Sequence, residues 1–99
     1  MSRPEYPLEL TINERKLSRV VIDQHYRQKH IEINDELILD LIKTIDGETY
    51  PVEKEIGPYQ YFVVEPIFLY DKPYRLIFLL CIFDNYLGVI NTFRIRKKL

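Results

Sequence analysis

The densest group of side chains able to do chemistry runs from His25 to His30, in the order HYRQKH. On a helix, Tyr26 and His30 lie four residues apart and Arg27 and His30 three apart, so each pair shares a face. Histidine exchanges protons near neutral pH, and arginine and lysine stabilise a phosphate. A base, an acid and nearby cations are the minimal chemistry for metal-free cleavage of RNA. We therefore take His25, Arg27 and His30 as candidate catalytic residues and Lys29 as a candidate phosphate-binding residue; the alternative is a solvated helix face.

Metal binding is not expected from the two histidines. They are too close in the chain to form a site by themselves, and no carboxylate lies between them. The carboxylates elsewhere are better interpreted as helix caps or solvating charges: Asp35, Glu36, Asp40, Glu53 and Glu55. The chain has no phosphate-binding glycine loop, dinucleotide glycine pattern, nucleophile elbow or zinc spacing. The sequence therefore predicts neither a metal nor a cofactor.

A second basic group lies near the C-terminal end. Strict alternation along residues 86–96 places Arg94 and Arg96 on one face of a strand. The other face carries Leu87, Val89, Phe93 and Ile95. With Lys97 and Lys98 beside them, the two arginines predict a small anion-binding stripe. A charged edge strand that resists aggregation is the alternative. Tyrosines near the strands could stack nucleic-acid bases, but we favour half-buried strand positions for Tyr59, Tyr61, Tyr70, Tyr74 and Tyr86.

Hydrophobic periodicity indicates the elements that must position these residues. It predicts strands at residues 8–12, 17–22, 49–56, 59–70, 74–83 and 86–96. Asp23 caps a short predicted helix that runs through His30, and Asn34 caps a second helix that ends at Asp46-Gly47. Pro66 predicts a bulge or a free edge, and Asp84-Asn85 predicts a two-residue hairpin loop.

These elements predict an α+β fold. Short turns between consecutive strands imply antiparallel neighbours. We expect an N-terminal strand pair, one or two short helices and then a three- or four-stranded antiparallel meander. The length of 99 residues fits a single domain, 1–99, with residues 1–7 as a flexible lead-in.

Charge and composition narrow the function classes. The chain has 14 basic and 15 acidic residues and a net charge of -1, so no global field draws it onto nucleic acid or membrane, and any basic site must be local. Cys81 is the only cysteine, which excludes an internal disulfide and favours a core position. We see neither a signal peptide nor an apolar stretch long enough to span a membrane, and we expect a cytoplasmic location.

One predicted strand is apolar on both faces. Residues 76–83 carry apolar side chains toward either side, whereas a single helical layer covers only one. The second face must be covered by the N-terminal hairpin, by sheet curvature or by another chain. A homodimer formed through this apolar sheet face is one such arrangement.

The order of elements, with a few residues, resembles the RelE/BrnT-type toxin superfamily. The strand 20–22 leads to His25, Asn34 opens a helix, and the last strand ends in arginines. Over residues 17–96 this resemblance implies a RelE-like layout and a ribonuclease of a toxin–antitoxin pair, which acts on RNA and is neutralised by an antitoxin protein. The positions it carries over are His25, Arg27, Arg94 and Arg96. Arg94 thereby joins the candidate catalytic residues, and Arg96 the RNA-binding candidates Lys97 and Lys98.

The chain departs from that superfamily in its charge. Such toxins are usually basic, whereas this chain is slightly acidic. The alternative function is a non-catalytic protein-interaction module of the same fold, which forms a dimer through its sheet.

Overall fold

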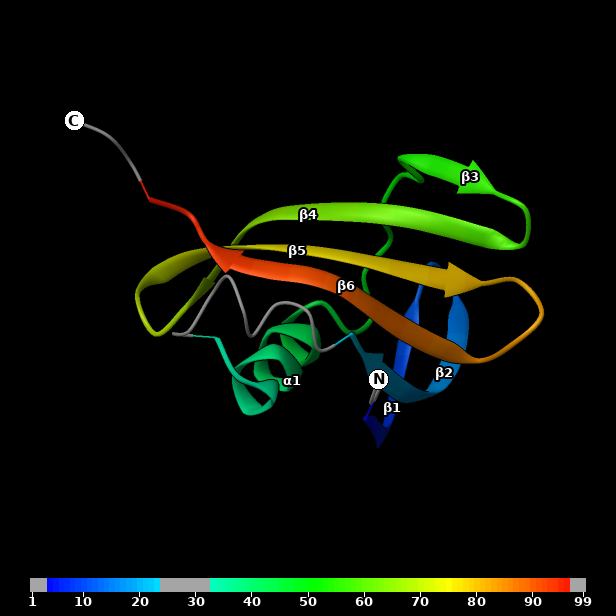
Figure 1. Cartoon of the computed structure of the whole chain (residues 1–99), viewed down its shortest axis with the longest axis horizontal. Coiled ribbons are helices and arrows are strands. Elements are labelled where there is room, and N and C mark those ends of the chain that lie inside the picture. The colour runs from blue at the N-terminus through cyan, green and yellow to red at the C-terminus, as the bar shows by residue number, and fades with distance from the viewer. Residues whose placement is uncertain (1–3, 24–32, 97–99) are drawn as a thin grey trace.

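The computed structural model describes residues 4–23 and 33–96, most of which form strands. The strands are β1 (Glu5–Ile12), β2 (Arg15–Ile22), β3 (Lys54–Ile56), β4 (Tyr59–Leu69), β5 (Lys72–Cys81) and β6 (Tyr86–Arg94) (Figure 1). Within the described ranges there is one helix, α1 (Asp35–Thr44). The helix predicted from Asp23 to His30 lies almost wholly outside the described residues.

All six strands belong to one mixed sheet, so the predicted α+β class is wrong. The strand order is β1-β2-β6-β5-β4-β3. Arg19–Ile22 of β2 pairs in parallel with Tyr86–Val89 of β6, while the other neighbours are antiparallel. The N-terminal strand pair therefore extends the sheet, and β3–β6 do not form a separate meander. The pairing of β2 with β6 joins segments that are far apart in the chain. Turn residues predict only which consecutive strands are neighbours, so they give no sign of this pairing.

The sheet is curled around its core. In Figure 1, α1 and the β1–β2 pair lie on the β6 side of the long strands, away from β3, and β1 and β2 run steeply to β4 and β5. Buried side chains from α1 and from five strands form one apolar cluster, in which the rings of Phe62 and Phe78 stack with centroids 5.0 Å apart. We call the side of the sheet that faces this cluster the inner face.

Helix α1 begins and ends as its local signals predict. The Asn34 side chain accepts a hydrogen bond of 2.8 Å from the Leu37 N–H, which satisfies one of the free N–H groups of the first turn. Ile38, Leu41 and Ile42 are buried on one side of the helix. Gly47 follows the helix with a φ of 88°, in the left-handed region that glycine adopts readily. No described helix is long and apolar enough to cross a membrane.

One turn and two bulges bear on the strand predictions. The loop between β5 and β6 spans residues 82–85, so the two-residue hairpin predicted at Asp84-Asn85 is wrong. A register shift between Val64 and Ile67 confirms the bulge predicted at Pro66. A second shift, at Ile90, turns the rest of β6 over, so that Thr92 and Arg94 share the inner side with Val89 and Phe93 does not. The predicted grouping of Phe93 with Val89 is therefore wrong.

Candidate functional site

The structure describes only part of the predicted catalytic and binding set. His25, Arg27, Lys29, His30, Lys97 and Lys98 lie outside the described residues. Arg94 is the last residue of β6, and Arg96 follows two residues later. The predicted approach of His25 and His30 to these arginines therefore stays a prediction.

Arg94 and Arg96 line a common hollow at the C-terminal end of β6. The hollow measures about 590 Å³ and is lined by Phe68, Pro73, Arg94, Ile95 and Arg96. The Ile95 N–H donates a hydrogen bond of 2.9 Å to the Pro73 carbonyl, so the chain continues beside β5 beyond the end of the strand. We call this site the Arg94 hollow.

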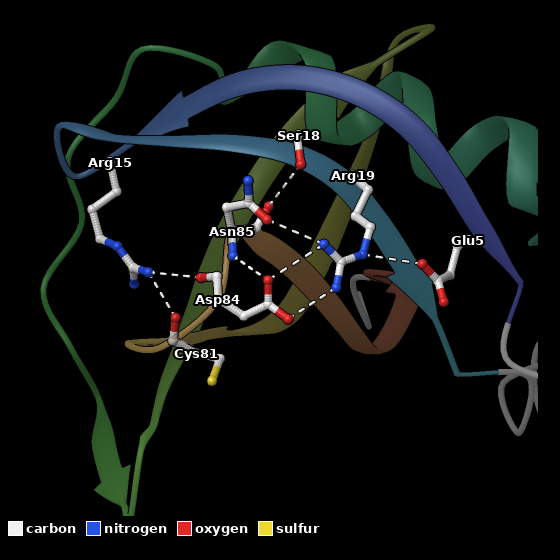
Figure 2. Close-up of polar contacts among 7 residues, drawn as sticks. All are labelled: Glu5, Arg15, Ser18, Arg19, Cys81, Asp84 and Asn85. Carbon is white, nitrogen blue, oxygen red and sulfur yellow. Dashed lines mark hydrogen bonds and ion pairs between the residues drawn. The ribbon is translucent and has the colours of Figure 1, made fainter.

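A different pair of arginines, Arg15 and Arg19, neither of them a predicted site residue, lies at the opposite end of β6 (Figure 2). Arg19 on β2 donates to Glu5 Oε1 at 3.0 Å, to Asp84 Oδ2 at 3.0 Å and to Asn85 Oδ1 at 3.1 Å. Its guanidinium also lies over the Tyr86 ring, 5.2 Å from the centroid. We call these five residues the Arg19 cluster.

Arg15 and Ser18 extend the same contacts along β2. Arg15 donates to the carbonyls of Cys81 and Asp84 at 2.6 and 3.0 Å, and the Ser18 N–H donates to the Asn85 carbonyl at 2.9 Å. The two bonds from Arg15 join β2 to the end of β5 and to the loop 82–85 (Figure 2), and the bond from Ser18 joins β2 to the same loop. These contacts bring the loop to the start of the parallel β2–β6 pairing, which makes their role structural. The only signal in the sequence is that Arg15 and Arg19 are an even number of residues apart and so share a strand face.

The electrostatics of the Arg19 cluster point away from proton transfer. The hydrogen bond from Arg19, followed by one from the Asn85 N–H, lowers the pKa of Asp84. The hydrogen bond to Asp84 raises the pKa of Arg19, and burial raises the pKa of Tyr86. Each shift moves the group further from neutrality, so all three keep their ordinary charge at neutral pH, whereas a general base works best with a pKa near the working pH.

A pocket of about 290 Å³ lies beside this cluster, with Arg19, Tyr86, Gly88 and Ile90 among its walls. Gly88 lies close to the neighbouring strand there, since a Cβ at this position would lie 3.0 Å from Leu79 Cδ1. The two charged side chains that it shares with the cluster, Arg19 and Glu5, form an ion pair with each other. Among the described residues no group of three or more His, Cys, Asp or Glu side chains could hold a metal ion.

The long strands also present a partly exposed face opposite the core. On β5, Tyr74, Leu76, Phe78 and Leu80 are buried, whereas the alternating Arg75, Ile77 and Leu79 remain partly exposed. Cross-strand pairing places Tyr61 beside Leu79, Val63 beside Ile77 and Phe93 beside Arg75. We call this set the outer face: Tyr61, Val63, Arg75, Ile77, Leu79 and Phe93. Helix α1 and the β1–β2 pair contribute their buried side chains to the inner cluster, on the other side of these strands.

Comparisons with protein-family models, with curated proteins and with solved structures find no significant match for this chain. The resemblance to RelE/BrnT-type toxins and the ribonuclease activity that it implies therefore stay predictions.

Proposed function

We propose that this chain is a non-catalytic interaction module that pairs with a second copy of itself through the outer face. The observation that carries the proposal is the β5 strand, which has apolar side chains on both sides but a core on only one. The N-terminal hairpin was one of the elements predicted to cover the second apolar face, but it instead extends the sheet beside β6. The hydrophobic effect favours removal of the remaining apolar side chains from water, which a facing sheet provides.

The charges of the outer face favour a second copy over a charged partner. Arg75 and the adjacent Glu65 form an ion pair of 3.5 Å, and the Arg75 guanidinium lies 5.5 Å from the centroid of the Phe93 ring. The two charges cancel, so this face attracts neither an acidic nor a basic surface. Two copies related by a two-fold axis present the same patch to each other, and each Arg75 then meets a neighbourhood that also carries a Glu65.

The oligomeric state tests this proposal. We expect the full chain to dimerise in a concentration-dependent manner in analytical ultracentrifugation, and Ile77→Lys to shift it to the monomer. Lysine at this partly exposed position extends its charge into water in the monomer, whereas a facing sheet would bury it. Ile82→Lys is the matched control because Ile82 is an exposed apolar residue of the loop 82–85, outside the outer face.

Two results would count against the proposal. One is a wild-type chain that stays monomeric at the highest soluble concentration. The other is a dimer that Ile77→Lys leaves intact. Circular dichroism melting of Ile77→Lys separates a monomer that has kept its fold from one that has unfolded.

A further inference from the structure

The two edges of the sheet differ in how far they are closed. At the β1 edge, the Thr11 N–H donates to Asp46 Oδ1 and the Thr11 carbonyl accepts from the Gly47 N–H, each at 2.7 Å. At the other edge, β3 has three residues whereas β4 has 11, and β3 pairs only with residues 59–61 of β4. In Figure 1, β3 accordingly lies beside one end of β4.

Beyond β3, the backbone of β4 carries unused hydrogen-bonding groups. The Tyr61 carbonyl accepts from the Glu53 N–H at 2.8 Å, so the backbone of Tyr61 faces this edge. Alternation along the strand turns the N–H and C=O groups of Val63 to the same edge, and those of Phe62 and Val64 to β5. In the described part of the chain, no strand pairs with β4 past Tyr61 on that side. An edge of this kind is a template for another strand.

The segment just before β3 does not extend that strand along β4. The Tyr50 N–H donates to Asn13 Oδ1 and the Tyr50 carbonyl accepts from Asn13 Nδ2, at 2.7 and 2.9 Å. Asn13 lies in the turn between β1 and β2, and Tyr50 packs against the inner cluster. The chain therefore turns away from the β4 edge before it reaches Val63.

The same strand exposes a large ring further along. Phe68 is 69% exposed and lies opposite Pro73. Val63 lies opposite Ile77, and both pairs are on the outer side of the sheet because Pro73 and Ile77 are an even number of residues apart on β5. The bulge at Pro66 separates the two positions, so a strand added here pairs with the backbone at Val63 and contacts the ring with its end.

We propose that the β4 edge binds an extended segment of a partner protein, which pairs with the backbone at Val63 and packs alternate apolar side chains against Val63 and Phe68. This goes beyond self-association through the outer face, because the added strand lies in the plane of the sheet. The antiparallel strand β3, already in place on residues 59–61, shows which ligand this edge accepts. An extended backbone offers donors and acceptors at the spacing of a strand edge and directs every second side chain to one face.

A fluorescent peptide of about eight residues that alternates valine with lysine tests the edge by anisotropy titration of the full chain. Residues paired across a ladder share a face, so the valines that cover Val63 and Phe68 also direct their N–H groups to β4. N-methylation of the valines removes these donors, keeps the side chains, and should weaken binding by about tenfold or more. The matched control peptide is N-methylated at its lysines, whose N–H groups point away from β4, and should bind as the unmodified peptide does.

Substitution of the exposed ring tests the side-chain contact. Phe68→Ala removes apolar surface that the peptide covers, and we expect it to weaken binding by about tenfold. Phe83→Ala is the matched control, because this ring is 82% exposed in the loop 82–85, and it should leave the affinity unchanged. Equal affinity of the three peptides, or equal loss in the two variants, overturns the proposal.

Amide hydrogen exchange followed by NMR locates the bound peptide. In the free chain the Val63 amide should exchange faster than those of Phe62 and Val64, and the peptide should slow it. A Val63 amide protected without peptide at every concentration means that the chain covers its own edge, and protection that grows with chain concentration means that a second copy does. Either result overturns the proposal. Ile77→Lys should keep peptide binding, so failure of the dimer and failure of this site give different results.

Discussion

The inner and outer faces of β5 differ in what the fold requires of them. Tyr74, Leu76, Phe78 and Leu80 point into the core and are at most 5% exposed. Arg75, Ile77 and Leu79 alternate with them and remain partly exposed. The two sets come from the same ten-residue strand, and apart from Arg75 both consist mainly of apolar side chains. Apolar character alone therefore does not distinguish residues that build the core from residues left over for association.

The difference between the two faces indicates which substitutions should affect stability and which should affect association. Core residues cannot be altered without loss of stability, because interiors are close-packed. Ile77 and Leu79 of the outer face are partly exposed, so the core of the described chain does not explain their apolar nature. Substitutions that compare the two faces test this distinction directly.

The largest effect is expected on the inner face at Phe78. Its ring is fully buried and stacks on Phe62, so Phe78→Ala should lower the free energy of unfolding by about 3–5 kcal/mol. Ile77→Ala, one residue away on the outer face, should lower it by about 1 kcal/mol or less when measured at concentrations below dimerisation. Urea denaturation followed by circular dichroism gives both values. Equal losses at the two positions would mean that the faces do not differ in their role.

A smaller effect, of opposite sign, is expected from Thr92. It is fully buried on the inner side of β6, and its hydroxyl has no hydrogen-bond partner in the described part of the chain. Thr92→Val replaces this hydroxyl with a methyl group of similar size, and should raise the free energy of unfolding by about 1 kcal/mol. Thr92→Ala serves as the control, since it removes the hydroxyl but also leaves a cavity. A Val variant less stable than wild type would show that the hydroxyl has a partner.

Local signals were sufficient for the helix and for the positions of most strands. Asn34 and Gly47 mark the ends of α1 because each acts on backbone groups only a few residues away. The bulge at Pro66 was equally local, since proline cannot donate to the ladder. The fold class failed because it depends on the pairing of β2 with β6, between residues more than sixty positions apart.

The candidate site was only partly accessible to the same reasoning. Arg94 and Arg96 were recognised as a basic pair, but Phe68, on a different strand, was not associated with them. The bulge at Ile90 also reversed the sides of β6, so alternation placed Phe93 on the wrong face. Arg15 and Arg19 were missed because most of their acceptors, on Cys81, Asp84 and Asn85, lie 65 to 69 residues away in sequence.

The smallest effect is expected at the polar corner of the sheet, in the Arg19 cluster. Arg19 lowers the pKa of Asp84 in the folded chain, so Asp84 binds its proton less readily there than in the unfolded chain. Its stabilising contribution is present above the unfolded pKa of about 3.9 and is lost as the pH falls through the folded value. Asp84→Asn should therefore reduce the free energy of unfolding at neutral pH, and the difference from wild type should shrink in acid.

Solvent exposure keeps this contribution modest. Arg19 and Asp84 have side chains that are 32% and 44% exposed, and exposed ion pairs are weakened by water and salt. Urea midpoints of wild type and Asp84→Asn at neutral and acidic pH measure the effect, with Glu9→Gln, a change at an exposed acid of β1, as the control. A difference that does not change with pH would mean that the loop 82–85 is held by the backbone acceptors of Arg15 and Ser18 rather than by the charge of Asp84.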